Sequence, residues 1–182
     1  MSIMTAALHS HLVITALGPD RPNIVNQFTQ SLINCGGNIL NTRMTSLGSE
    51  FGIMLLIEGT WGAIAKIEAG LTAIGTKLGI TVTVRRTTPK QPRLQTITYL
   101  VHAVTIDREG IINDLTKFFI MQDISIEDIN AHTYLAHTGT RMSSMTININ
   151  ISSNTHLPTL REQFMLYCDA LNLDAGLEPL RE

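Results

Sequence analysis

Cysteine, aromatic residues and surplus charge are all scarce in this sequence. It has 2 cysteines among 182 residues, aromatic residues make up 5%, and the formal net charge is −2. Because a dedicated nucleic-acid surface needs a basic excess, we expect no direct nucleic-acid binding. Cys35 and Cys168 lie within apolar helical patterns, so we expect buried free thiols in a reducing cytoplasm; a disulfide or redox pair is the alternative.

Targeting and membrane-spanning patterns are also missing. Residues 1–11 have neither the basic stretch nor the apolar core that marks a secretory signal. No run approaches the roughly 18 apolar residues that a transmembrane helix requires. We therefore expect a cytoplasmic protein without membrane contact.

Recognisable catalytic and metal-binding motifs are absent as well. None of the six histidines forms a metal-ligand pair of the His-Glu-x-x-His kind, so we expect them to be exposed or half-buried. Ser143-Ser144 lacks the Gly-x-Ser-x-Gly elbow of a hydrolase, and Gly36-Gly37 ends a predicted helix instead of opening one. The sequence predicts no catalytic residues, no metal and no cofactor, and it argues against an enzyme.

What the sequence does contain is a regular order of apolar segments, with hydrophobic residues making up 44% of the chain. In the first half the periodicity predicts strand, helix, two strands, helix and strand. This is the order of a ferredoxin-like βαββαβ sandwich of the α+β class, with an antiparallel sheet and both helices on one face. The continuously apolar strand 51–57 is expected to be central in its sheet. The predicted segments are 11–17, 22–34, 38–47, 51–57, 61–78 and 80–86.

The same order begins again in the second half. The turn at 107–113 repeats the turn at 20–26, an offset of 87 residues (107 − 20 = 87) that holds into the second strand. Thr88–Gln95 contains two prolines and no apolar periodicity, which is typical of a linker. We predict two units, 1–87 and 96–182, joined by a linker at 88–95. The repeated segments are strand 97–106, a helix from about 111, strands 124–134 and 145–151, helix 157–171 and strand 173–177.

The turn from the first strand into the first helix, Gly18–Val25, is where we expect chemistry; we call it the first corner. Arg21 precedes a proline, which favours Pro22 as the first helical residue. The helix end then presents unpaired N–H groups and a positive dipole end, both suited to a carboxylate or phosphate. Asp20, just outside that end, can accept an ammonium group. A small zwitterion would satisfy both halves of the corner.

Together these features resemble the ACT domain family. The resemblance depends on the βαββαβ order, on Asp20-Arg21-Pro22 after the first strand, on Asn38-Ile39 opening the second, and on Ile53–Leu56 followed by Gly59 and Trp61. It covers nearly the whole chain, with the closer match up to about residue 87. A chain of two such units is similar to bacterial ACT-domain repressors of the glycine cleavage genes.

The resemblance implies an amino-acid site. ACT domains typically pair side by side and bind an amino acid between the first corner of one unit and its neighbour. A polar residue in the turn and an asparagine opening the second strand hold the ligand in that family. These positions are Asp20 and Asn38 here, and Asp107 and Ser125 in the second repeat. The candidate ligand-binding residues are therefore Asp20, Arg21, Pro22, Asn23, Ile24, Asn38, Asp107, Gly110 and Ser125.

Three positions depart from the family's pattern. Asn23 stands where glycine is usual; asparagine tolerates left-handed backbone better than most residues, but its side chain fills space. The second repeat keeps Gly110, has Glu109 in place of the proline and has Ser125 in place of the asparagine. Without any ligand, Asp20 and Asp107 could serve helix-end electrostatics, and Asn38 could bond its own backbone in a turn.

The function implied by the resemblance is regulatory. We expect a non-enzymatic, homo-oligomeric repressor of transcription that responds to a small amino acid, with glycine as the expected ligand. It would act by contacting a DNA-bound activator protein of the LysR type, with the ligand shifting the population that can bind this partner. The alternative is an ACT interaction module that oligomerises and binds its partner without any ligand.

Overall fold

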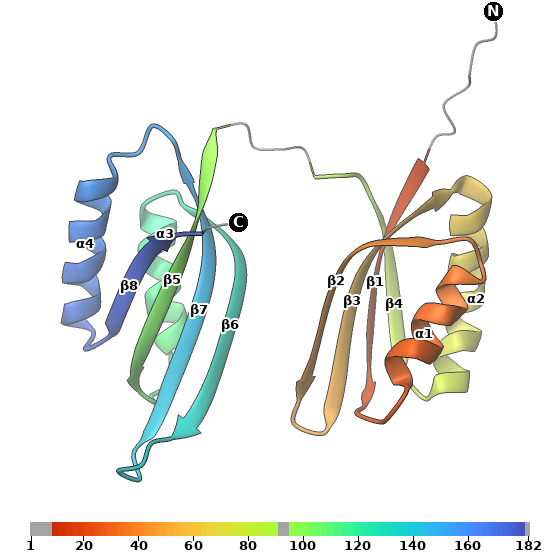
Figure 1. Ribbon diagram of the computed structural model, residues 1–182, viewed down its shortest axis with the longest axis horizontal. Coiled ribbons are helices and arrows are strands. Elements are labelled where there is room, and N and C mark those ends of the chain that lie inside the picture. The colour runs from red at the N-terminus through yellow and green to blue at the C-terminus, as the bar shows by residue number, and fades with distance from the viewer. Residues whose placement is uncertain (1–8, 91–94, 181–182) are drawn as a thin grey trace, which may run out of the picture. The chain divides into compact units, whose positions relative to one another are not determined.

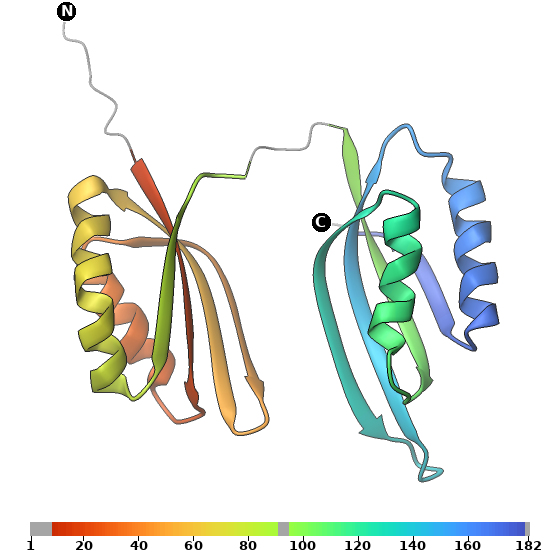
Figure 2. The ribbon, with the colours of Figure 1, turned by 180° about the vertical axis from the view of Figure 1, so that it is seen from behind.

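Two four-stranded antiparallel sheets, each covered on one face by two helices, form the described part of the chain (Figures 1 and 2). The structure is a computed structural model that describes residues 9–90 and 95–180, and the chain divides into units 1–91 and 92–182. Residues 91–94, the middle of the predicted linker 88–95, lie outside the described residues. The predicted α+β class with repeated βαββαβ units is confirmed.

The first unit follows the predicted order, and its central strands are β3 and β1. The sheet order is β2-β3-β1-β4, so β3 is internal as predicted from its continuous apolar run. The prediction that Pro22 begins the first helix is wrong, because α1 begins at Ile24 after Asn23 adopts a left-handed conformation. The elements are β1 (His9–Pro19), α1 (Ile24–Ile33), β2 (Asn38–Leu47), β3 (Glu50–Thr60), α2 (Trp61–Leu78) and β4 (Thr81–Thr87).

The second unit repeats this topology with sheet order β6-β7-β5-β8. The repetition extends to irregularities: the register shifts between Ile39 and Asn41 in β2, and between Ile126 and Asp128 in β6. These bulges are 87 residues apart (126 − 39 = 87), which is the offset expected from the sequence. The elements are β5 (Thr96–Ile106), α3 (Ile111–Met121), β6 (Ser125–Leu135), β7 (Arg141–Ser152), α4 (Leu157–Ala170) and β8 (Asp174–Pro179).

Each unit has its own hydrophobic core between its sheet and its helices. Alternate residues of β1, such as Leu12 and Ile14, point to the helices and are fully buried, because successive side chains of a strand face opposite sides of the sheet. From α1, Phe28 and Leu32 are fully buried against them. Trp61, the first residue of α2, is 67% exposed, because the buried stripe of this helix begins one turn later, at Ile64.

The cysteines and histidines can now be placed in the fold. Both cysteines are free thiols, as predicted; Cys168 is buried, whereas Cys35 is only half-buried. All six histidines are exposed or half-buried. Across residues 9–90 and 95–180, no helix is long and apolar enough to cross a bilayer.

Candidate functional site

The first corner presents an uncapped helix end. Asn23, the N-cap residue of α1, has φ 69° and ψ 5°, and no side chain caps the helix. Gly110, its counterpart in the second repeat (110 − 23 = 87), has φ 78°. The two positions share one backbone conformation, which explains why glycine or asparagine is needed there. The first intrahelical bond runs from the Gln27 N–H to the Asn23 carbonyl at 3.1 Å, so the N–H groups of Val25 and Asn26 have no acceptor within the helix.

Asp20 is exposed at this corner and is held by the β2–β3 hairpin. Its carboxylate oxygen Oδ2 accepts a hydrogen bond from the Ser46 hydroxyl at 2.7 Å, and its backbone N–H donates to the Ser49 carbonyl at 3.0 Å. An ionised carboxylate can accept about four hydrogen bonds, so capacity for an ammonium group remains. Ser46 was not predicted, because the hairpin that brings it to Asp20 is a tertiary feature.

The other predicted residues of the first corner have different environments. The Arg21 guanidinium turns to the end of α2, where its Nη2 donates to the Leu78 carbonyl at 2.8 Å. Ile24 is buried in the core with 3% exposure, so it can contribute only backbone to a ligand. Its N–H already donates to the Arg21 carbonyl at 3.4 Å. Pro22 and Asn23 are exposed.

Asn38 lies at the opposite end of the same sheet from Asp20. It is exposed and pairs with Glu58 on β3, which in turn pairs with His11 on β1. Asp20 is nine residues beyond His11 (20 − 11 = 9), so at the rise of a strand the two side chains are roughly 30 Å apart. Within one unit Asp20 and Asn38 therefore cannot share a small ligand.

The second repeat has the same separation between its two candidates. Ser125 pairs with Asn150, which pairs with Thr98, and Asp107 is nine residues beyond Thr98 (107 − 98 = 9). Asp107 is half-buried, and its Oδ1 accepts from the Ser143 hydroxyl at 2.7 Å. The serine comes from β7 in this unit and from β2 in the first unit, yet in both it donates to the equivalent corner aspartate.

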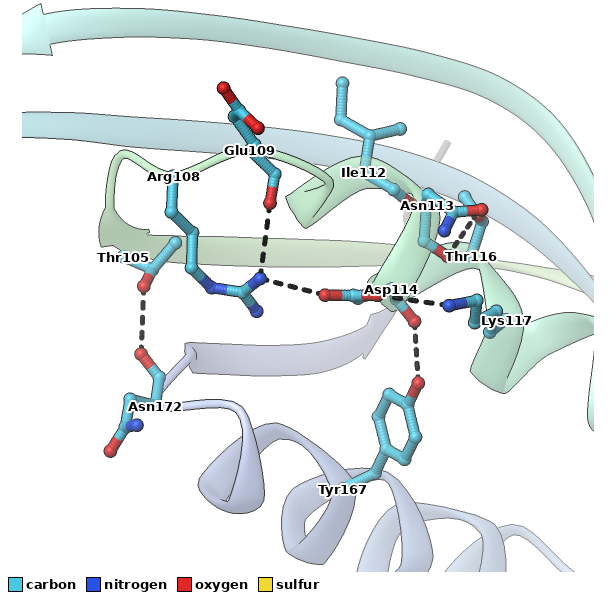
Figure 3. Close-up of polar contacts among 10 residues, drawn as sticks. All are labelled: Thr105, Arg108, Glu109, Ile112, Asn113, Asp114, Thr116, Lys117, Tyr167 and Asn172. Atoms are coloured by element: carbon cyan, nitrogen blue, oxygen red, sulfur yellow. Dashed lines mark hydrogen bonds and ion pairs between the residues drawn. The ribbon is translucent and has the colours of Figure 1, made fainter.

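In the second corner, the turn at 107–113 that repeats the first, Arg108 and the start of α3 form an internal ion pair (Figure 3). The Arg108 guanidinium donates to Asp114 at 2.8 Å, and the Lys117 ammonium donates to the other oxygen of the same carboxylate at 3.3 Å. Arg108, and next Lys117, hold the pKa of Asp114 below its usual range. The Tyr167 hydroxyl donates to the Asp114 backbone carbonyl at 2.7 Å, and the Thr105 hydroxyl donates to the Asn172 carbonyl at 2.9 Å.

No group of three or more histidine, cysteine, aspartate or glutamate side chains within residues 9–90 and 95–180 could hold a metal ion. The features that remain are a carboxylate at each corner and an open helix end, which suit binding of a small polar molecule.

Comparison with known proteins identifies the family. The ACT domain family matches residues 10–85. The glycine cleavage system transcriptional repressor of Escherichia coli (strain K12) is 31% identical over 176 residues, which cover 96% of this chain and 92% of that protein. The chain belongs to the ACT-domain family of this repressor. It is a regulatory ACT-domain protein that is homologous to this repressor. ACT domains also occur in enzymes.

Solved structures agree with the tandem ACT fold. A crystal structure assigned provisionally to the glycine cleavage system transcriptional repressors has a TM-score of 0.72 and 28% identity, and covers 96% of this chain and 99% of its own. An uncharacterised protein of Galdieria sulphuraria has a TM-score of 0.76 at 20% identity, over 95% and 99% of the two chains. The second comparison concerns the fold alone.

Proposed function

We propose that this ACT-domain protein is a non-enzymatic cytoplasmic repressor of the glycine cleavage genes that responds to a small amino acid, with glycine as the first candidate. The ammonium group would pair with Asp20, and the carboxylate would lie at the uncapped start of α1. Asn38 would complete the site only from a neighbouring unit, because it is roughly 30 Å from Asp20 in its own.

The observation that carries this proposal is the relation to the Escherichia coli repressor along 96% of the chain. The geometry of the first corner supports the amino-acid part. The Asp20 carboxylate is exposed and the start of α1 has no side-chain cap. The DNA-bound activator protein as partner, and homo-oligomerisation through the ACT units, belong to the same proposal.

Calorimetric titration of the full chain tests the ligand. We expect saturable heat with glycine, weaker heat with alanine and serine, and loss of binding in Asp20→Asn, which keeps the shape but removes the charge. Glu50→Gln, a charge removal at the neighbouring hairpin, serves as control and should leave binding unchanged. Absence of heat with all three amino acids would remove the sensing part of the proposal.

A ligand-independent interaction module is the second candidate, and one observation favours it. Both corner aspartates already accept a serine hydroxyl at 2.7 Å, a shared arrangement that can hold the corner without any ligand. Affinity capture of partner proteins from cells with and without added glycine separates the two functions. A sensor recovers the DNA-bound activator to different extents in the two conditions, whereas a module recovers it equally, including in Asp20→Asn.

A further inference from the structure

A polar groove runs between α1 and α2 in the first unit, and Asp20 is not among the residues that line it. It has a volume of about 450 Å³ and is lined by Arg21 and Lys77 and by the amides of Asn26, Gln27, Gln30 and Asn34. Ile74 and Leu78 form its apolar part. None of the residues that line it is acidic, and no carboxylate in the described ranges pairs with Arg21 or Lys77.

The second unit shows what the same position looks like when a carboxylate occupies it. Gln27 corresponds to Asp114 (114 − 27 = 87), and Asp114 binds both Arg108 and Lys117. Arg108 in turn corresponds to Arg21 (108 − 21 = 87). The first unit therefore keeps the arginine and loses the internal anion that neutralises it in the second.

The space of the groove is also filled in the second unit and open in the first. Ser31 corresponds to Phe118 (118 − 31 = 87), and Ile74 corresponds to Tyr167, since buried Leu71 and Phe164 are offset by the same 93 residues (167 − 74 = 164 − 71 = 93). The rings of Phe118 and Tyr167 lie 5.3 Å apart, and the Tyr167 hydroxyl bonds α3. Side chains that close the second unit are thus replaced by smaller ones in the first.

We propose that the groove between α1 and α2 binds a small organic oxyanion, with its charged group at Arg21 and Lys77 in the position that the Asp114 carboxylate takes in the second unit. The amides of Gln27, Gln30 and Asn34 can donate to and accept from hydroxyl or amide groups on the body of such a ligand. Charge-assisted hydrogen bonds to arginine and lysine supply the affinity. The Asp20 carboxylate does not line this groove, and the Arg21 guanidinium, although Arg21 is one of the candidate ligand-binding residues of the first corner, turns to the end of α2; neither proposal needs the other.

The test is a nuclear magnetic resonance titration of the full chain with succinate, citrate and inorganic phosphate, with sodium chloride at equal ionic strength as reference. We expect saturable shifts of the side-chain amide resonances of Asn26, Gln27, Gln30 and Asn34. The three probes distinguish a carboxylate ligand from a phosphate ligand. Absence of any saturable shift beyond that of sodium chloride would overturn the proposal.

Two variants test the site in independent ways. Gln27→Asp installs the internal carboxylate of the second unit, and Ser31→Phe installs its aromatic filler; each should abolish the saturable shifts while the remaining backbone spectrum stays that of the folded protein. Shifts that persist in both variants would contradict the proposal. Lys77→Ala should weaken binding roughly tenfold through loss of one charge-assisted bond. Lys66→Ala, an exposed lysine of α2 outside the groove, is the matched control and should bind as the natural protein does.

Discussion

At the scale of the residue, Asn23 shows how one backbone conformation constrains the side chain. Its φ of 69° equals that of Gly110 to within 9° (78 − 69 = 9), although the two side chains differ. Left-handed backbone costs most residues about 1–2 kcal/mol relative to glycine, and asparagine pays less than most. The fold therefore accommodates asparagine at position 23, where the second repeat has glycine.

This conformation leads to a prediction for the first unit. Asn23→Ala should lower the free energy of unfolding of that unit by about 1 kcal/mol, whereas Asn23→Gly should leave it unchanged or slightly higher. Urea titration followed by amide resonances of each unit measures the two effects separately. Gly110→Ala is the matched change and should destabilise the second unit instead. Equal stability of Asn23→Ala and Asn23→Gly would show that the corner relaxes to another conformation.

Cys168 gives a prediction about pH. Burial, with a smaller effect of Asp169, raises the pKa of its thiol to about 12 from 9.0. The unfolded chain therefore releases this proton from about pH 9, while the folded chain retains it up to about pH 12. The contribution of this thiol to the free energy of unfolding is therefore fully present below pH 9. It is lost as the pH rises from about 9 to about 12, at up to about 1.4 kcal/mol per pH unit.

Urea titrations of the second unit at about pH 8 and about pH 11 measure that loss. Other groups also change charge between these pH values. The informative quantity is therefore the slope of the free energy of unfolding against pH, compared between the natural protein and Cys168→Ala. The variant should be less stable at pH 8 because of the cavity, and it should lose less stability on going to alkaline pH. Parallel slopes for the two proteins would contradict the assigned pKa.

At the scale of the element, the helices of the first unit begin in different ways. Thr60 is the N-cap of α2, and its hydroxyl oxygen accepts from the Ala63 N–H at 3.2 Å. The start of α1 has no such cap. At the start of α2 the cap provides an acceptor for a backbone N–H group. The uncapped start of α1 leaves backbone N–H donors available to another group, as the proposed amino-acid site requires.

The capped helix yields a quantitative expectation. Thr60→Ala should destabilise the first unit by about 1 kcal/mol, and Thr60→Ser, which keeps the hydroxyl, should cost only a few tenths of that. Thermal unfolding followed by circular dichroism or urea titration measures the difference. A loss of the same size in both variants would mean that the methyl group of Thr60, and not its hydroxyl, matters.

At the scale of the whole molecule, the two cores are built from separate sets of residues. Phe164 is fully buried in the second core, with the rings of Phe118 and Phe119 at 5.3 Å and 5.7 Å. Phe164→Ala should therefore cost the second unit about 3–5 kcal/mol. Amide hydrogen exchange should show that β5–β8 lose protection, whereas β1–β4 keep theirs.

The reciprocal change provides the control for this prediction. Phe28 is fully buried in the first core, so Phe28→Ala should expose the amides of the first unit and spare the second. If either substitution removed protection from both units, the two would unfold as one cooperative body, and the division into two units would be thermodynamically irrelevant.

The difference between prediction and structure is clearest at the ligand-binding candidates. Asp20 and Asn38 are 18 residues apart (38 − 20 = 18) and share a predicted role, but the register of β1, β3 and β2 places them at opposite ends of the sheet. Strand pairing is a long-range property that local periodicity does not contain. For the same reason the sequence predicts the two corner aspartates but not the hydrogen bonds that Ser46 and Ser143 donate to them.

Local patterns in the amino-acid sequence are enough to predict the α+β class, the duplication and the 87-residue offset, because apolar periodicity and turn residues act locally and occur twice. The left-handed backbone of Asn23, by contrast, was not predicted, because the sequence pattern placed Pro22 as the first helical residue. Which side chains meet depends on long-range packing and is visible only in the folded protein. Arg21 binds the end of α2, while Arg108 binds Asp114, so the two units differ in charge and open space at one equivalent place. That difference depends on how the two helices of each unit pack against each other. In the second unit the larger side chains Phe118 and Tyr167 fill the space that Ser31 and Ile74 leave open in the first.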